Sequence, residues 1–437
     1  MCDFYFVLYL KKYLTILNLK ILHTSKSTLF QKNIFLMLKG TFIAQTIGVI
    51  GSLIIAKVYG SEAYGIFGLF ISISSVLKII NTFQLDKTIV TLQNENESKN
   101  LMNSLFVITL FLSLTFIIIY KSLSLIFNLN SINFSILILS ILASIIFSFN
   151  IIHESFLTFR KKFHPISNAK IYMAFFNIIF QLLLFHKFKL MGLIYGNIIS
   201  ISLISIYYFI KNHNYLSNIN FQQLKKSITS NSSVIKYLFP SSLINSLAIN
   251  LMPILIVAFF SLKETGEYFL SLKILATPLF LISSSISQVY YQKSSEMLHT
   301  SKEKLFNFTK KIVLINLALM LLFIIVINTV GIFFLELFFN KNWENLRLFT
   351  FILSFLILAK SSFNPISNII IVLHKNHISL LFNCYLLIVN LMAIYIGYTN
   401  SNILQTIIIL SLFGSFGYIV LLLYFMNELK KLKNNYG

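Results

Sequence analysis

Three lysines lie inside long apolar segments of the chain, where an ammonium group is costly unless a polar or anionic partner faces it. They are Lys78, Lys273 and Lys360. An ammonium in a partly desolvated site attracts an anion far more strongly than it does in water, so these residues could bind a phosphate or another anionic group. The alternative is that a lysine extends its charge to the headgroups, and Lys78 lies close enough to the inner end of its segment to do so.

Polar side chains accompany these lysines at helical spacing. At 100° per residue the longest such stripe contains Lys273, Thr277, Ser284 and Gln288. Lys78 and Lys360 have shorter stripes of Ser, Thr and Asn, and Gln45 forms a milder one with Thr41 and Ser52. Serine and threonine can instead bond backbone carbonyls, and Gln45 or Asn250 can join two helices. The predicted pathway residues are Lys273, Lys78, Lys360, Gln45, Asn250, Thr277, Ser284 and Gln288.

Other kinds of chemistry have little support in the sequence. No Asp or Glu lies deep in an apolar segment, since Glu154 and Glu336 are near segment ends, and this disfavours a carboxylate proton relay or a buried sodium site. The sequence has no metal-ligand cluster and no glycine-rich phosphate loop. The outer loops carry no paired acids for glycosyl transfer. We therefore predict no catalytic residue, no metal site and no cofactor, and the chain is not expected to be an enzyme.

The apolar segments themselves indicate a membrane protein. Hydrophobic residues make up 57% of the 437 residues, charged residues make up 11%, and the mean hydropathy is +0.81. A soluble domain of this composition would expose a large apolar surface. About 18 to 22 residues of helix cross roughly 30 Å of hydrocarbon. Twelve such segments can be drawn, at 40–58, 64–83, 103–120, 133–152, 171–186, 191–210, 238–261, 268–290, 312–335, 348–368, 378–397 and 403–426.

A repeated pattern indicates how these segments are grouped. Leu-Ile-Ile-Ala at 53–56 is followed by Glu62 and Phe67, and 202 residues later Leu-Ile-Val-Ala at 255–258 is followed by Glu264 and Phe269. The predicted fold is therefore an all-α integral membrane protein, with about twelve transmembrane helices in two six-helix lobes related by this internal repeat. Six spans per lobe restore the chain direction, so Glu62 and Glu264 are expected on the same side of the membrane.

The net charge of +22 comes from cations that flank the helices, not from one patch, which argues against a nucleic-acid partner. If the N-terminus is cytoplasmic, 25 Lys or Arg residues lie on the inner side, seven on the outer side and three within spans. This asymmetry follows the positive-inside rule, so we expect both termini in the cytoplasm. Membrane lipids are the expected surroundings.

The predicted organisation has five parts along the chain. They are a cytoplasmic or interfacial segment at 1–32, an N-lobe at 33–210, a cytoplasmic inter-lobe linker at 211–237, a C-lobe at 238–427 and a basic cytoplasmic tail at 428–437. The first segment is either an amphipathic surface helix or an over-extended start. Gly65 and Gly266 are expected to supply backbone freedom at tight outer turns, and Trp343 is expected at headgroup level.

Five short motifs resemble a known family and occur in its order. The first is Leu53 to Gly65, ending a span at the first outer turn. The others are Phe159-Arg160-Lys161-Lys162-Phe163, Phe239-Pro240, Gly266-Glu267-Tyr268 with Lys273, and Asn340-Lys341-Asn342-Trp343. Over residues 33 to 430 the chain resembles the polysaccharide-biosynthesis flippases, which are the O-antigen and capsule repeat-unit translocators of the multidrug/oligosaccharidyl-lipid/polysaccharide exporter superfamily. Asn340 stands where that family usually has glycine.

The resemblance implies movement of an undecaprenyl-diphosphate-linked oligosaccharide from the inner to the outer leaflet of the bacterial cytoplasmic membrane by alternating access of the two lobes. It also implies a cationic cavity, consistent with Lys78, Lys273 and Lys360, and makes the polymerase and chain-length machinery of the same pathway candidate partners. The two additional C-terminal spans usual in lipid II flippases are missing, as is the buried first-helix acid of drug exporters. A small-molecule exporter of the same superfamily and an integral-membrane glycan polymerase or ligase are the alternatives.

Overall fold

A computed structural model describes residues 29–127, 134–213, 229, 232, 234–339, 343–373 and 375–434. Most of the predicted segment at 1–32 and most of the linker at 211–237 therefore lie outside the described residues. The N-lobe helices are α2 (Leu29–Thr82), α3 (Asp86–Thr91), α4 (Glu95–Phe127), α5 (Phe134–Phe159), α6 (Phe163–Phe188) and α7 (Gly192–Asn212). The C-lobe helices are α9 (Phe239–Phe259), α10 (Leu262–Thr300), α11 (Lys302–Val326), α12 (Ile332–Phe339), α13 (Leu346–Phe363), α14 (Ile369–Val372), α15 (Asn376–Thr399) and α16 (Ile403–Asn434).

The helices are long enough for the predicted crossings. Within the described residues, nine helical stretches are long and apolar enough to cross a bilayer. Two of them, Lys39–Thr82 and Phe163–Asn212, contain 44 and 50 residues, so each is long enough to cross twice. The nine stretches therefore provide eleven crossings, and α10, which contains 39 residues, is long enough for a twelfth. The prediction of an all-α membrane protein with two six-helix lobes related by an internal repeat is confirmed.

The two outer turns of the repeat are built differently. In the N-lobe, α2 bends at Gly60, whose φ of 78° is a conformation that glycine adopts without a steric penalty. In the C-lobe, Ser261 caps α10: its hydroxyl accepts a hydrogen bond from the Glu264 amide at 3.2 Å and donates one to the Glu264 carboxylate at 2.8 Å. Gly65 and Gly266 lie inside helices, so the prediction that they provide freedom at the turns is wrong.

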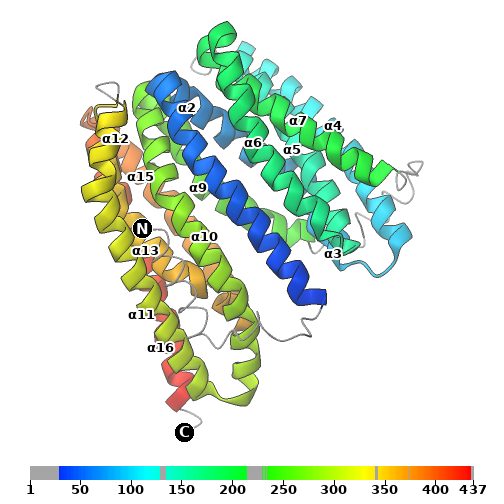
Figure 1. The fold of residues 1–437 in the computed structure, drawn as a ribbon, viewed down its shortest axis with the longest axis vertical. Coiled ribbons are helices and arrows are strands. Elements are labelled where there is room, and N and C mark those ends of the chain that lie inside the picture. Colours follow the sequence, from blue (N-terminus) through cyan, green and yellow to red (C-terminus); the bar gives the residue numbers. More distant parts are fainter. Residues whose placement is uncertain are drawn as a thin grey trace.

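The lobes meet where α2 packs against α10 and α9 (Figure 1). The most extensive hydrophobic cluster of the described residues contains side chains of both lobes, including Ile55, Tyr64, Leu270 and Trp343. The lobes also touch at the other ends of these helices, where the rings of Phe83, just after α2, and Phe239, at the start of α9, lie edge to face at 4.9 Å. The strongest inter-lobe packing is therefore apolar and lies near the outer turns.

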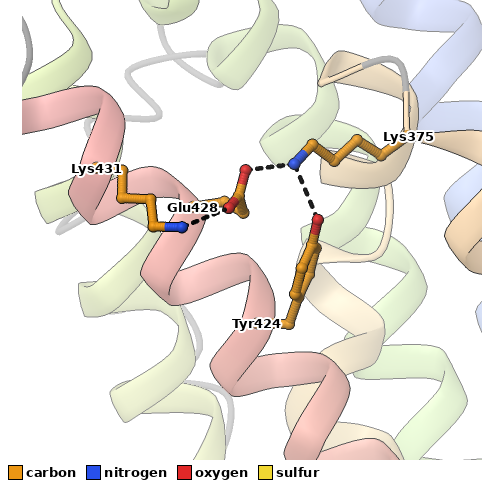
Figure 2. A network of polar contacts seen from close by, with 4 residues as sticks. All are labelled: Lys375, Tyr424, Glu428 and Lys431. Atoms are coloured by element: carbon orange, nitrogen blue, oxygen red, sulfur yellow. Dashed lines mark hydrogen bonds and ion pairs between the residues drawn. The ribbon is translucent and has the colours of Figure 1, made fainter.

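A polar network joins Lys375, just before α15, to the last turns of α16 (Figure 2). The ammonium of Lys375 donates to the Glu428 carboxylate and to the Tyr424 hydroxyl, and Lys431 lies 3.4 Å from the same carboxylate. The hydrogen bond to Glu428 raises the pKa of Lys375. Because α16 continues to Asn434, residues 428–434 of the predicted basic tail are the last turns of a helix.

Candidate functional site

Two glycines allow the backbones of α2 and α10 to touch. A Cβ atom added to Gly65 would lie 1.9 Å from the carbonyl oxygen of Leu262, and one added to Gly266 would lie 1.9 Å from the carbonyl oxygen of Ser61. Close helix approach of this kind is the usual role of small residues in membrane interfaces. The contact is reciprocal, so both turns of the repeat lie at the same end of the molecule, as expected from the parallel repeat.

This reciprocal contact differs slightly from the register of the sequence repeat. In space Ser61 corresponds to Leu262 and Gly65 to Gly266. The sequence pattern instead pairs Leu53 with Leu255, which is one residue further along. Glu62 and Glu264, before the two glycines, and Phe67 and Phe269, after them, keep the 202-residue spacing, so the contact in space is offset from the sequence repeat by one residue.

Aromatic side chains surround the glycine contact. Tyr64 is 1% exposed, and its ring centroid lies 6.2 Å from that of Phe269 and 5.9 Å from that of Trp343. We call Tyr64, Gly65, Gly266, Phe269 and Trp343 the outer contact. Trp343 is only 6% exposed, so its indole is covered by protein, and its depth at headgroup level stays a prediction. A position at a segment boundary could not indicate that the ring packs against Tyr64 of the other lobe.

Lys273 lies one helical turn after Phe269, immediately beside the outer contact. Its ammonium is 3.5 Å from the Tyr64 hydroxyl and 5.7 Å from the centroid of the Tyr64 ring. The Tyr64 hydroxyl in turn donates to the Ser52 carbonyl at 3.1 Å. The side chain of Lys273 is half-buried, and no described carboxylate forms an ion pair with it. It is therefore a cation with a neutral partner, which leaves it able to bind an anion.

Lys78 has a different environment inside the N-lobe. It is half-buried in α2, and its electrostatic neighbours are Asp86 at the start of α3 and Glu154 in α5. Burial raises the pKa of Asp86, while a 2.7 Å hydrogen bond from Thr82 and the nearby lysines oppose that rise. The two acids offset part of the charge of Lys78, so Lys273 is the better candidate for binding an anion.

Lys360 is half-buried near the end of α13, and its ammonium makes no hydrogen bond or ion pair with the described residues. Just beyond it, the helix is interrupted at Asn364–Ile366. The Asn368 amide then donates to the Ser287 hydroxyl of α10 at 3.0 Å. This bond and the packing of Asn364–Ile366 against α10 place the break after Lys360 beside the second half of α10.

The remaining predicted residues lie on α2, α9 and α10. Gln45 and Thr277 are half-buried, whereas the side chains of Ser284 and Gln288 are outside the described part of α10. Asn250 is half-buried and donates to the Ser246 carbonyl at 2.9 Å, so its amide bonds within its own helix. The structure thus places Lys273 next to Tyr64 of the partner lobe.

Two charged residues inside the N-lobe had not been singled out as pathway residues. Lys170 of α6 is half-buried and donates to the Thr41 hydroxyl at 3.4 Å, beside the stripe that contains Gln45. It is also an electrostatic neighbour of Glu154. The sequence could have indicated this pair, because the acid Glu154 follows the apolar segment 133–152 and the lysine Lys170 precedes the next segment, 171–186.

Residues 54–347 match the polysaccharide biosynthesis protein family. The chain belongs to this family. No curated protein matches it.

Solved structures share its fold. An inward closed lipid II flippase MurJ is 14% identical, with coverage of 92% of this chain and 90% of that chain and a TM-score of 0.71. An inward-facing multidrug resistance MATE family transporter of the MOP superfamily is 15% identical, with coverage of 91% and 96% and a TM-score of 0.62. An outward-facing MATE structure has 15% identity, coverage of 92% and 96% and a TM-score of 0.56. The chain therefore shares the fold of these proteins.

Proposed function

We propose that this protein is a flippase that moves undecaprenyl-diphosphate-linked oligosaccharide repeat units from the inner to the outer leaflet of the bacterial cytoplasmic membrane, for O-antigen or capsule biosynthesis. Its membership of the polysaccharide biosynthesis family supports this substrate class over a drug. The two-lobed transporter fold supports alternating access, and the excess of inner-side cations supports cytoplasmic termini.

One observation supports a specific binding position for the diphosphate. Lys273 is a half-buried cation with only a neutral phenol as its described hydrogen-bond partner, and it lies directly beside the closed outer contact. A diphosphate entering between the lobes from the inner side would find there an ammonium that is not neutralised by a carboxylate. Lys360 and, less directly, Lys78 would extend the cationic path, with Gln45, Asn250, Thr277, Ser284 and Gln288 available for the sugar hydroxyls.

Deletion of the gene in its host tests this function. Lipid-linked repeat units should accumulate in the inner leaflet while the surface glycan disappears, and a plasmid copy should restore both. If the protein were a small-molecule exporter, deletion would leave the glycan intact and change drug sensitivity. If it were a polymerase, single repeat units would still reach the surface. Either of these outcomes would reject the flippase proposal.

A further inference from the structure

Two consecutive hydrogen bonds, both made by the Tyr64 hydroxyl, link the two lobes at the outer contact. The Tyr64 hydroxyl donates its proton to the Ser52 carbonyl at 3.1 Å and accepts from the Lys273 ammonium at 3.5 Å. Ser52 and Tyr64 lie on either side of the Gly60 bend in α2, whereas Lys273 belongs to α10. Tyr64 is therefore the residue through which the cation of one lobe is tied to both arms of α2 in the other.

The ring of Tyr64 also contributes to the aromatic packing of the outer contact. It lies within 6.3 Å, centroid to centroid, of Phe67, Phe269 and Trp343, and it is buried among them. Its neighbour Gly65 makes the close backbone contact with α10. A change in the position of Tyr64 would therefore disturb the aromatic packing and the glycine contact that hold the outer ends of the lobes together.

We propose that Tyr64 couples substrate binding to opening of the outer contact. In the empty protein it holds Lys273 and keeps the contact closed, and a diphosphate bound at Lys273 replaces it as the partner of the ammonium. An anionic oxygen is a stronger acceptor for an ammonium than a neutral phenol, so this exchange is favourable. This inference rests on the proposed function, because it requires a diphosphate substrate at Lys273.

The exchange gives the diphosphate a higher affinity for the open state than for the closed one. In the closed state the ligand must compete with Tyr64 for the ammonium, whereas in the open state it does not. A ligand shifts a conformational equilibrium only through such a difference in affinity. Tyr64 is thus a positioning residue: it acts on the substrate through Lys273, and its role should appear in the state of the outer contact.

Opening of the outer contact can be measured as the distance between two spin labels, one on each lobe. The labels are attached at the exposed positions Glu62→Cys and Ser401→Cys. In this full-length chain the native Cys2 and Cys384 are replaced by serine. The distance distribution of the labels is measured in lipid nanodiscs, without ligand and with undecaprenyl diphosphate. Undecaprenol, which lacks the diphosphate, is the uncharged control lipid. In the wild-type background, undecaprenyl diphosphate should increase the population at long distances, and undecaprenol should not.

Tyr64→Phe keeps the ring and removes the hydroxyl. Without ligand it should raise the ratio of open to closed outer contact about fivefold, which is the ratio expected for losing the one inter-lobe hydrogen bond, since the bond to Ser52 lies within α2; undecaprenyl diphosphate should add little. Tyr59→Phe is the matched control, because the hydroxyl of Tyr59 donates to the Gln181 carbonyl within the N-lobe. It should behave like the wild type. If Tyr64→Phe fails to fold, Lys273→Met removes the cation at similar length and should give the same ligand-independent opening.

Two results with the variants overturn the coupling. One is a variant pair in which Tyr64→Phe and Lys273→Met match the wild-type distances with and without undecaprenyl diphosphate. The other is opening by Tyr59→Phe to the same extent, which would mean that any lost phenol loosens the helices. A wild-type protein that binds undecaprenyl diphosphate without a change at the outer contact rejects the coupling but not the substrate. Failure to bind that lipid at all contradicts the substrate assignment and the coupling together.

Discussion

The three intramembrane lysines differ in what surrounds them, and this decides how each can act. Lys273 has a phenol and an aromatic ring as its neighbours, and Lys360 has no described hydrogen-bond or ion-pair partner. Lys78 lies near two acids of its own lobe. A neutral residue at position 78 would remove positive charge that balances part of the negative charge of Asp86 and Glu154. A neutral residue at position 273 removes a cation with which no described acid forms an ion pair. Lys273 is therefore the residue at which function can be separated from folding.

Replacing Lys273 by glutamine should abolish most of the transport without lowering the amount of protein in the membrane. Loss of a charge-assisted hydrogen bond costs roughly 1.5 to 3 kcal/mol, which corresponds to about a tenfold or greater reduction in rate. Surface glycan and membrane protein would be measured in the complemented deletion strain. Lys310→Gln, at an exposed position of α11, is the control and should behave as wild type. Wild-type surface glycan with Lys273→Gln would rule out its proposed role.

The sequence predicted some of these residues and could not predict others. An ammonium in an apolar segment is costly wherever it lies, so Lys273 could be recognised without knowing its neighbours. Tyr64 and Trp343 could not, because aromatic side chains at the end of a membrane helix usually face the headgroups, and only the packing of one lobe on the other buries them. Lys170 and Glu154 were similarly hidden by their closeness to segment ends.

At the scale of elements, the contact between α2 and α10 depends on the absence of two side chains. Gly65 and Gly266 each approach a backbone carbonyl of the opposite helix, and a carbonyl cannot move aside as a flexible side chain can. The closed outer contact is therefore sensitive to a single added methyl group. Because the contact is reciprocal, the two positions should respond alike.

Gly65→Ala and Gly266→Ala should each open the outer contact and reduce transport, while each lobe remains folded. The distance between labels at Glu62→Cys and Ser401→Cys would report the opening. Gly48→Ala is the matched control, since a Cβ there meets no atom within 4 Å, and it should leave both readouts unchanged. Equal distances in all three variants would contradict the role assigned to the glycine contact.

The capped turn before α10 should contribute to stability in a way that its repeat partner does not. Ser261→Ala removes both hydrogen bonds with Glu264 and should cost about 1 kcal/mol, the usual effect of losing a helix cap. Thermal unfolding of the purified protein in detergent would reveal a lower midpoint. Glu62→Ala removes the exposed carboxylate that the sequence repeat pairs with Glu264, and it should leave the midpoint unchanged. An equal loss in both variants would mean that the two turns are stabilised alike.

The number of membrane crossings and their helical type could be predicted because hydrocarbon thickness sets the length of a span. How the turns are made could not. A glycine near the end of an apolar segment is compatible with a bend or with close helix packing. Only the structure assigns the bend to Gly60 and the packing to Gly65 and Gly266.

At the scale of the whole molecule, the scarcity of intramembrane acids bears on the driving force. An anionic diphosphate that moves outward travels down an inside-negative potential, and each net charge gains about 2.3 kcal/mol per 100 mV. For two charges this is roughly 4 to 5 kcal/mol, comparable to about a thousandfold bias. The gain is smaller if Lys273 moves with the substrate, because its charge cancels part of the transported charge.

Transport should therefore depend more on membrane potential than on a proton or sodium gradient. Reconstituted vesicles with a potassium-diffusion potential, and with equal pH and sodium on both sides, would measure this. An inside-negative potential should accelerate outward movement, and its collapse should slow it. Transport that ignores the potential and starts only after a pH step would contradict the prediction and direct attention to Glu154 and Asp86 as proton acceptors.

The central claim is that this chain carries a lipid-linked oligosaccharide across the membrane. Its most direct test is to reconstitute the purified protein into vesicles that contain a fluorescent undecaprenyl-diphosphate-linked oligosaccharide and to quench the outer leaflet with a membrane-impermeant reagent. Active protein should make nearly all of the labelled lipid accessible over time, Lys273→Gln should expose the protected half about tenfold more slowly, and vesicles without protein should keep about half protected. Equal protection with wild-type protein, with Lys273→Gln and without protein would contradict the account.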